Sequence, residues 1–214
     1  MTCVLVLGLP RSGTSAVAGV LQHLGVFMGE RLMPAMPDVN ARGFFEDEEF
    51  VEMHIRLMRS HEDPQILFDV PEPPDEQQLE CYRDLIHRRE DQHHLWGIKD
   101  PKLCFLLPYF LQRLRTMVRL VRVRRPFHES VQSMRPLYGG MSLERSATLL
   151  ARYLYSLDRN LAATRSPLLT LEYTHLLGAS GREFVGTLAD FVGADPVTVS
   201  GAHAFLEPGL RHQK

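Results

Sequence analysis

A short apolar run, followed at once by a glycine-bounded loop, constrains the fold of this chain more than any other feature. Residues Cys3–Leu7 (CVLVL) are continuously apolar, which is typical of a parallel strand buried on both faces. The loop Gly8–Ser15 (GLPRSGTS) comes next, and apolar residues then recur at helical spacing from Gly13 to about Leu24. A strand, a tight loop and a helix in this order predict the first unit of an α/β fold.

The rest of the chain repeats this alternation of strand and helix. Further buried strands are expected over Leu95–Ile98, Met117–Val123 and Leu168–Leu171. The patterns also predict helices over Asp47–Arg59, Glu76–Asp91, Leu103–Leu114, Ser142–Ala163 and Gly181–Val192, another helix with Pro126 as its first residue, and a proline-rich surface loop over 62–75. We therefore predict a doubly wound α/β fold, with helices on both faces of a parallel sheet. No linker or repeat interrupts the 214 residues, so residues 1–214 are expected to form a single domain.

The composition argues against several classes of protein. A formal net charge of −2 provides no basic field for nucleic acid. No apolar run reaches the roughly 18–20 residues that span a bilayer, and the apolar start lacks the basic segment of a secretory signal. Cys3, Cys81 and Cys104 show no CxxC spacing, and His93-His94 has no partners at metal-ligand spacing. We expect a cytoplasmic protein without nucleic-acid or membrane partners and without a metal site.

The glycine loop indicates an anion site. Gly8 and Gly13 have the spacing of the nucleotide P-loop, G-x-x-x-x-G-K-[ST], which predicts a P-loop NTPase-like sheet. Thr14 stands where that motif has lysine, and Arg11 inside the loop supplies the cation instead. A sulfuryl group in transfer carries less negative charge than a phosphoryl group, so arginine, lysine and loop amides can serve it without a metal. The competing interpretation is a tight strand-to-helix turn with incidental serine and threonine.

Several segments together resemble the bacterial branch of the sulfotransferases that use 3′-phosphoadenosine 5′-phosphosulfate (PAPS). GLPRSGTS is similar to the 5′-phosphosulfate loop of that family, and Asn40–Glu46 (NARGFFE) to a glycine-aromatic-glutamate segment of its bacterial members. Trp96–Lys102 (WGIKDPK) resembles their WGxKDP motif. Arg124–Met134 (RRPFHESVQSM) resembles the element that binds the 3′-phosphate, and the tail Phe205–His212 extends the resemblance over nearly the whole chain.

The resemblance implies where the nucleotide binds. It places five loop residues around the 5′-phosphosulfate: Arg11, Ser12, Gly13, Thr14 and Ser15. It assigns the 3′-phosphate to Ser133 and to an arginine that in the common pattern lies two residues before the proline and eight before the serine. Here Arg124 satisfies the first spacing and Arg125 the second, so both remain candidates.

Transfer to a hydroxyl needs charge stabilisation at the leaving oxygen. Lys99 is the candidate for this role together with Arg11, because it follows a predicted strand end, where doubly wound sheets place their sites. It is also one of only three lysines among 24 basic residues. The alternative is that Lys99-Asp100-Pro101-Lys102 is a turn with an Asp100–Lys102 surface pair.

Transfer also needs a base for the hydroxyl proton, and two residues qualify. Glu46 lies in the aromatic segment just before a predicted helix, where it could instead be one of several acids that complement the helix dipole. His54 is the second candidate, since cytosolic members of the family use histidine. It falls on the apolar face of the same predicted helix, so the competing interpretation is a core histidine with satisfied hydrogen bonds.

Taken together, the sequence predicts a metal-independent enzyme that moves a sulfuryl group from PAPS to a hydroxyl or amine acceptor and releases 3′-phosphoadenosine 5′-phosphate (PAP). The acceptor is expected to be a small molecule or a carbohydrate, bound by variable loops such as 26–45 and 62–75. Arg211 and His212 in the tail could close over the 3′-phosphate. The rival functions are a P-loop kinase of small molecules and a nucleotide-binding module without catalysis.

Overall fold

The protein is described by a computed structural model, which covers residues 1–40, 42–58, 73–135, 140–176 and 181–206. Most of the predicted loop 62–75 and the tail residues Arg211 and His212 lie outside these described residues.

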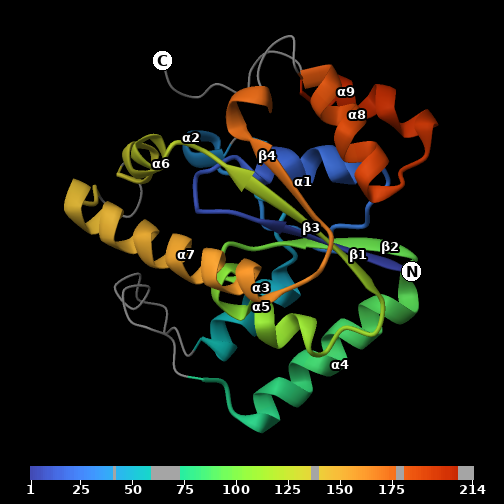
Figure 1. Cartoon of the computed structure of the whole chain (residues 1–214), viewed down its shortest axis with the longest axis horizontal. Coiled ribbons are helices and arrows are strands. Elements are labelled where there is room, and N and C mark those ends of the chain that lie inside the picture. Colours follow the sequence, from blue (N-terminus) through green and yellow to red (C-terminus); the bar gives the residue numbers. More distant parts are fainter. Residues whose placement is uncertain (41, 59–72, 136–139, 177–180, 207–214) are drawn as a thin grey trace.

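A four-stranded parallel sheet forms the centre of the molecule (Figure 1). Its strands are β1 (Thr2–Leu7), β2 (Leu95–Lys99), β3 (Met117–Arg124) and β4 (Leu168–Glu172), in the order β2-β1-β3-β4. β1 pairs with β2 on one side and β3 on the other, and β3 pairs with β4. The predicted doubly wound α/β fold is confirmed, since every connection between paired strands is a crossover.

Helices follow the strands much as the sequence predicts. The elements outside the sheet are α1 (Thr14–His23), α2 (Pro37–Asn40), α3 (Glu48–Leu57), α4 (Glu76–Gln92), α5 (Leu103–Leu111), α6 (Phe127–Met134), α7 (Leu143–Ala163), α8 (Gly181–Val192) and α9 (Val199–Phe205), with 3₁₀ turns η2 (Tyr173–Leu176) and η4 (Pro196–Thr198). The sequence predicted Pro126 as the first residue of α6. In the structure Pro126 is the N-cap, and the helix begins one residue later, at Phe127. The short helices α2 and α9 and both 3₁₀ turns were not predicted.

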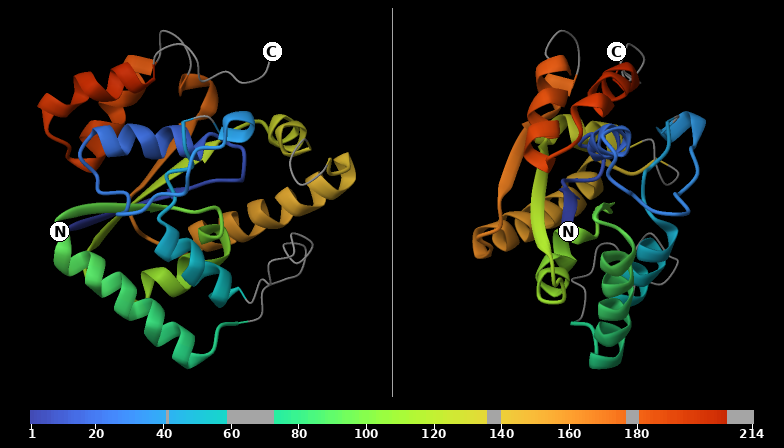
Figure 2. Two further views of the ribbon diagram at one scale, coloured as in Figure 1. Left: turned by 180° about the vertical axis from the view of Figure 1, so that it is seen from behind. Right: turned by 90° about the vertical axis from the view of Figure 1, so that its right-hand side faces the viewer.

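The apolar run of β1 is buried on both faces of the sheet. Cys3, Leu5 and Leu7 belong to a core shared with α3, α4, α5 and α7, whereas Val4 and Val6 belong to a second core shared with α1, α8 and α9. The two views of Figure 2 and Figure 1 show these helix sets on opposite sides of the sheet. Alternation along a strand buried on both faces explains why its sequence is continuously apolar.

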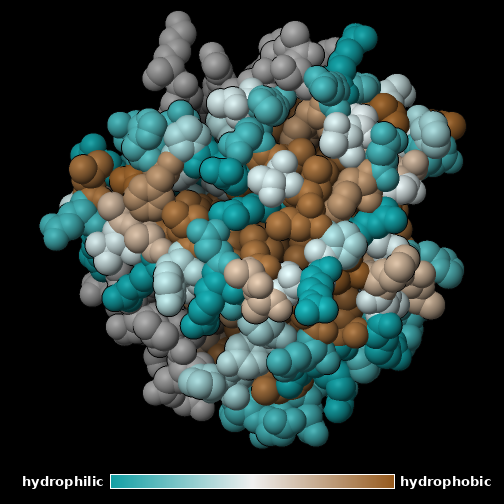
Figure 3. Space-filling view, in the orientation of Figure 1, coloured by the Kyte–Doolittle hydropathy of each residue, from teal (hydrophilic) through white to brown (hydrophobic). Residues whose placement is uncertain are grey.

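β4 is an edge strand of the sheet, and part of this side of the sheet is exposed among the described residues. Leu168 in β4 is 43% exposed and Met117 at the start of β3 is 65% exposed. Figure 3 shows apolar surface over the centre of this face, where Figure 1 places β4. In the part of the chain that the structure describes, no helix is both long enough and apolar enough to cross a bilayer.

Candidate functional site

The glycine loop lies at the carboxyl end of β1 and adopts a strained, tightly packed path. Arg11 and Gly13 have φ values of 67° and 96°, in the left-handed region. A Cβ on Gly8 would lie 2.8 Å from the carbonyl oxygen of Val123, and one on Gly13 would lie 2.4 Å from the Tyr173 ring. The loop therefore needs glycine at both ends, because β3 and η2 press against it.

Hydrogen bonds within the glycine loop and beneath it hold its backbone in place. The Ser12 hydroxyl donates a 2.7 Å hydrogen bond to the Leu9 carbonyl, which also accepts from the Ser12 backbone N–H at 3.1 Å. The thiol of Cys104 lies beneath the loop and donates to the Gly8 carbonyl at 3.5 Å. Burial raises the pKa of this thiol to about 12, so it stays protonated and keeps its role as a donor.

The loop leads directly into the N-terminus of α1. This helix begins at Thr14 with neither a side-chain cap nor an acidic residue in its first turn. The first-turn N–H groups and the positive end of the helix dipole favour an anion, and no carboxylate of that turn competes for the position. The predicted loop residues Ser12, Gly13, Thr14 and Ser15 thus lie together at an anion-binding geometry.

Arg11 links this loop to the helix that follows β3. Its Nε donates to the Ser133 hydroxyl of α6 at 3.1 Å, and its Nη1 donates to the Val39 carbonyl of α2 at 3.0 Å. Ser133 is 122 residues away in the sequence and buried. The structure therefore brings together Arg11 and Ser133, which the sequence placed in one nucleotide site.

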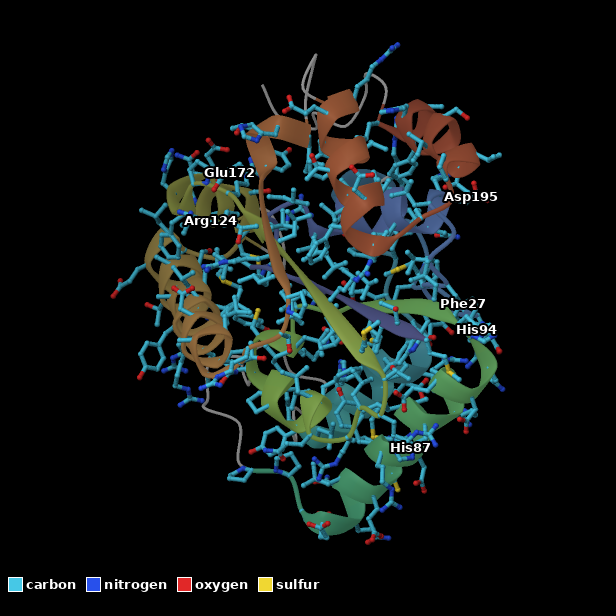
Figure 4. All side chains as sticks on the ribbon, turned by 45° about the vertical axis from the view of Figure 1, so that its right-hand side comes forward. Phe27, His87, His94, Arg124, Glu172 and Asp195 are labelled. Carbon is cyan, nitrogen blue, oxygen red and sulfur yellow. The ribbon has the colours of Figure 1, made fainter. Side chains whose placement is uncertain are left out.

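The two adjacent arginines after β3 have different surroundings. Arg125 donates from Nη1 to the Arg11 carbonyl at 3.0 Å, and its guanidinium carbon lies 4.4 Å from the centre of the Tyr173 ring. Arg124 is 59% exposed and pairs with Glu172 at the end of β4 at 3.4 Å. Figure 4 shows the two residues close together. Arg125 is therefore part of the loop site, and Arg124 points away from it.

Lys99 and Glu46 form an ion pair at the end of β2. The Lys99 ammonium contacts the Glu46 carboxylate, and the two side chains are only 4% and 13% exposed. Phe45, directly before the glutamate, has a φ of 55° and packs edge-on against Phe205 with ring centres 5.7 Å apart. Arg42 donates to the Phe205 carbonyl, so α9 anchors the segment that presents Glu46.

His54 lies in the core rather than at the loop. Its side chain is fully buried, with Nδ1 2.8 Å from an Asp100 oxygen and Nε2 2.8 Å from the Tyr82 hydroxyl. Both ring nitrogens are thus engaged inside the protein. This arrangement fits the interpretation of His54 as a satisfied core histidine, which the sequence left open beside a catalytic one.

Asp100 organises the turn after β2. It accepts from the Lys102 backbone N–H at 2.8 Å and pairs with the Lys102 ammonium at 3.4 Å. The Asp100–Lys102 pair of the alternative interpretation is therefore present, but its carboxylate is buried. Burial alone would raise the pKa of Asp100, yet the Lys102 charge and the hydrogen bond from His54 outweigh it and hold that pKa well below its usual range.

Sequence reasoning missed the structural role of Asp100 and Tyr82. Their signal is weak, because Asp100 reads as part of a turn and Tyr82 as one aromatic residue on the polar helix α4. The signal that the sequence does offer is His54 on the apolar face of a predicted helix, because a histidine buried there needs hydrogen-bond partners inside the core.

A separate polar cavity of about 340 Å³ lies between the N-terminus of α3 and the C-terminal part of α4. Its buried Arg89 pairs with Asp47 at 2.9 Å and with Glu49 at 3.0 Å, and its guanidinium lies 5.7 Å from the centre of the Phe27 ring. Figure 4 shows Phe27 near His94, on the opposite side of the molecule from Arg124. The charges in this cavity offset each other, and the cavity lies apart from the glycine loop.

Comparisons with known proteins show what the fold resembles. No protein-family model matches the chain, and no curated protein matches it by sequence. The sulfotransferase domain of the olefin synthase from Synechococcus PCC 7002 is similar in structure, with a TM-score of 0.56, 17% identity, and coverage of 94% of this chain and 77% of that one.

Two other solved structures have comparable similarity. The sulfotransferase STF9 from Mycobacterium avium has a TM-score of 0.54 and 14% identity, covering 96% of this chain and 68% of its own. A sugar kinase from Janibacter has a TM-score of 0.50 and 14% identity, covering 92% and 98%. At such low identity the similarity shows the fold alone, one that sulfotransferases and P-loop kinases share.

Proposed function

We propose that this protein is a PAPS-dependent sulfotransferase that transfers a sulfuryl group to a hydroxyl or amine of a small molecule or carbohydrate. The observation that carries the proposal is the contact between Arg11 and Ser133. It joins the lysine-free glycine loop after β1 to the helix after β3, the two elements that a nucleotide with phosphate groups at both its 5′ and 3′ positions would bridge.

The residues present fit such a nucleotide. Left-handed backbone at Arg11 and Gly13 shapes the loop, and the N-terminus of α1 supplies N–H donors for the 5′-phosphosulfate. Ser133 and Arg125 would hold the 3′-phosphate, since a guanidinium fork matches phosphate oxygens. Arg124 is left outside this proposal because it pairs with Glu172.

Lys99 and Glu46 would carry the chemistry beside that site. Glu46 would accept the proton of the acceptor hydroxyl, while Lys99 and Arg11 would offset the charge that develops on the leaving phosphate oxygen. These roles need a carboxylate and an ammonium held near each other with little exposure, as the ion pair at the end of β2 provides. We propose that no metal ion is required.

A P-loop kinase of small molecules is the second candidate, favoured by the similarity to the Janibacter sugar kinase. The missing loop lysine argues against it, because kinases of this architecture use that lysine and magnesium to neutralise a polyphosphate. Titration calorimetry with PAP and with ATP, each with magnesium and with EDTA, separates the two. Metal-independent PAP binding with weak ATP binding supports the sulfotransferase, and magnesium-dependent ATP binding without PAP binding contradicts it.

Lys99 allows a direct test of the proposed chemistry. We expect Lys99→Met to lower turnover by roughly 100-fold or more while the affinity for PAP changes little, because its interaction matters in the transition state. Lys102→Met is the matched control, since Lys102 lies in the same turn but pairs with Asp100. Equal losses in turnover and in PAP affinity would show a binding role only.

The acceptor and the location of the protein belong to the same proposal. Loop 26–45, which contains α2 and leads to Glu46, is proposed to contact a small-molecule or carbohydrate acceptor. All three cysteines are unpaired, which suits the reducing cytoplasm that we propose as its location.

A further inference from the structure

A buried hydrogen-bonded chain connects the two elements that present Lys99 and Glu46. It runs from the Asp100 carboxylate through the His54 ring to the Tyr82 hydroxyl, with both links 2.8 Å long. These three side chains are among the most buried in the protein. They take no part in the loop site, and a chain of polar groups in an apolar core needs a reason.

This hydrogen-bonded chain joins the residue after Lys99 to the helix after Glu46. Asp100 directly follows Lys99 at the end of β2, and His54 is on α3, whose N-cap Asp47 directly follows Glu46. Among the described residues, the bond between His54 and Asp100 is therefore a buried polar link between the two segments that form the ion pair. Tyr82 continues the link to α4, which packs beside α3.

The chemistry of the three side chains decides which group donates and which accepts in each hydrogen bond. An ionised carboxylate can only accept, so His54 Nδ1 carries the hydrogen that Asp100 receives. In a neutral ring Nε2 then accepts from the Tyr82 hydroxyl. His54 has both nitrogens engaged inside the protein and is completely buried, so it has no nitrogen left for an acceptor hydroxyl.

From this geometry we propose that His54 is a positioning residue: by donating to Asp100 it holds α3 against the end of β2 and thereby keeps Glu46 against Lys99. The role of this ion pair in catalysis rests on the sulfotransferase function proposed above. The role of His54 in forming the pair rests only on the described contacts.

Two amide variants separate the two bonds of His54. His54→Asn places its amide nitrogen near the position of Nδ1 and can still donate to Asp100, whereas His54→Gln places its nitrogen near Nε2, toward Tyr82. Tyr82→Phe is the matched control, because it removes a buried hydroxyl from the same chain and leaves the His54–Asp100 bond. His54→Gln and Tyr82→Phe nearly keep the size of the side chain, whereas asparagine is smaller than histidine, so thermal unfolding checks that each variant is folded.

The ion pair itself is read by NMR without any substrate. The chain has only three lysines, so protein labelled with ¹³C,¹⁵N-lysine gives three sets of side-chain signals, and Lys99→Arg identifies that of Lys99. Glu46→Gln sets the position of the Lys99 signal when its carboxylate partner is lost. We expect His54→Gln to move the Lys99 signal toward that position, while His54→Asn and Tyr82→Phe leave it near the wild-type position.

Other patterns overturn the proposal. It fails if His54→Gln leaves the Lys99 signal unchanged, if His54→Asn moves it as far as His54→Gln does, or if Glu46→Gln itself has no effect. These spectra decide the matter even if wild-type protein neither binds PAP nor transfers a sulfuryl group, a result that would contradict only the proposed function.

Turnover provides the second readout. Displacing a reacting group by about 1 Å can cost roughly 100-fold in rate, so we expect His54→Gln to lower turnover by about 10- to 100-fold with PAP affinity unchanged. In a Glu46→Gln background the same substitution should cost little more, because there is no base left to position. A full additional loss in that background contradicts positioning of Glu46, and loss of activity in both His54→Asn and His54→Gln would indicate a catalytic histidine.

Discussion

At the scale of single residues, two adjacent residues can contact different parts of the molecule because the backbone turns between them. Arg124 is the last residue of β3 and reaches across to Glu172 at the end of β4, whereas Arg125 follows the strand and turns back to the glycine loop. Spacing relative to Pro126 and Ser133 could not separate them, since each arginine satisfies one of the two family spacings. Their partners in the fold do so.

This difference predicts how the two arginines affect nucleotide binding. Arg125→Ala should weaken PAP binding by about 10- to 100-fold, since a charge-assisted hydrogen bond contributes roughly 1.5–3 kcal/mol. Arg124→Ala should leave it within about threefold, because an exposed ion pair contributes little. Calorimetry measures both affinities.

Adenosine 5′-phosphosulfate, which lacks the 3′-phosphate, is the ligand control for Arg125. If Arg125 contacts that phosphate, Arg125→Ala should hardly change binding of this ligand. An equal loss for both ligands, or a larger effect of Arg124→Ala on PAP, would show that the assignment is wrong.

At the scale of elements, buried polar contacts fix how helices and strands meet. The buried Glu90 of α4 accepts from the backbone N–H groups of Arg115 at 2.9 Å and Thr116 at 2.8 Å, just before β3 begins. Asn160 of α7 donates to the Cys104 carbonyl of α5 at 2.8 Å. Each bond satisfies a backbone group at a junction, so it sets the position of one element on another.

Glu90→Ala should therefore lower the free energy of unfolding by about 2–4 kcal/mol, since it leaves two backbone N–H groups without their acceptor. Urea denaturation measures the loss. Asp91→Ala is the control, because Asp91 is the exposed neighbour that contacts the same Arg115 from outside. We expect its unfolding midpoint to stay close to that of the wild type.

PAP binding by folded Glu90→Ala should be unchanged, because this junction is at the end of the sheet opposite the glycine loop. A variant as stable as the wild type would show that the buried carboxylate does not hold the junction together.

At the scale of the whole molecule, buried ionised groups couple stability to pH. Asp100 lies in the core beneath the site, and its folded pKa is held below the ordinary value of 3.8 mainly by the Lys102 charge and the His54 hydrogen bond, against the effect of burial. A carboxyl whose pKa is lower in the folded state stabilises the fold above its ordinary pKa. That contribution is lost as the pH falls below this value.

The wild type should accordingly lose stability as the pH falls from about 4 toward 2, because the loss that Asp100 causes reaches about 1.4 kcal/mol per pH unit once the pH is below its ordinary pKa. Asp100→Asn should be less stable at neutral pH but show a shallower acid dependence. Urea denaturation across this range measures both. The exposed Asp84→Asn should follow the wild-type curve, and an undiminished acid slope in Asp100→Asn would contradict the role of this carboxyl.

The sequence by itself determined the elements and the loop of this protein. A continuous apolar run marked β1, short and largely apolar segments marked the other three strands, helical spacing marked the long helices, and the two glycines marked the strained loop. These signals are local: each depends on side-chain periodicity or on backbone conformation within a few residues. The resemblance carried by the motifs also placed Arg11 and Ser133 in one nucleotide site, and the needs of sulfuryl transfer made Lys99 and Glu46 candidates beside it, without showing how these residues meet.

Only the tertiary structure decided which residues meet. Glu46 and Lys99 are 53 residues apart and Arg11 and Ser133 are 122 apart, so their contacts depend on strand order and on how each helix packs. The same is true of His54, whose partners Asp100 and Tyr82 come from other elements. The short helix α9 likewise depends on packing against α1, because seven residues are too few to be stable in isolation. Such contacts have no periodic signal in the chain, since they arise only when distant segments fold together.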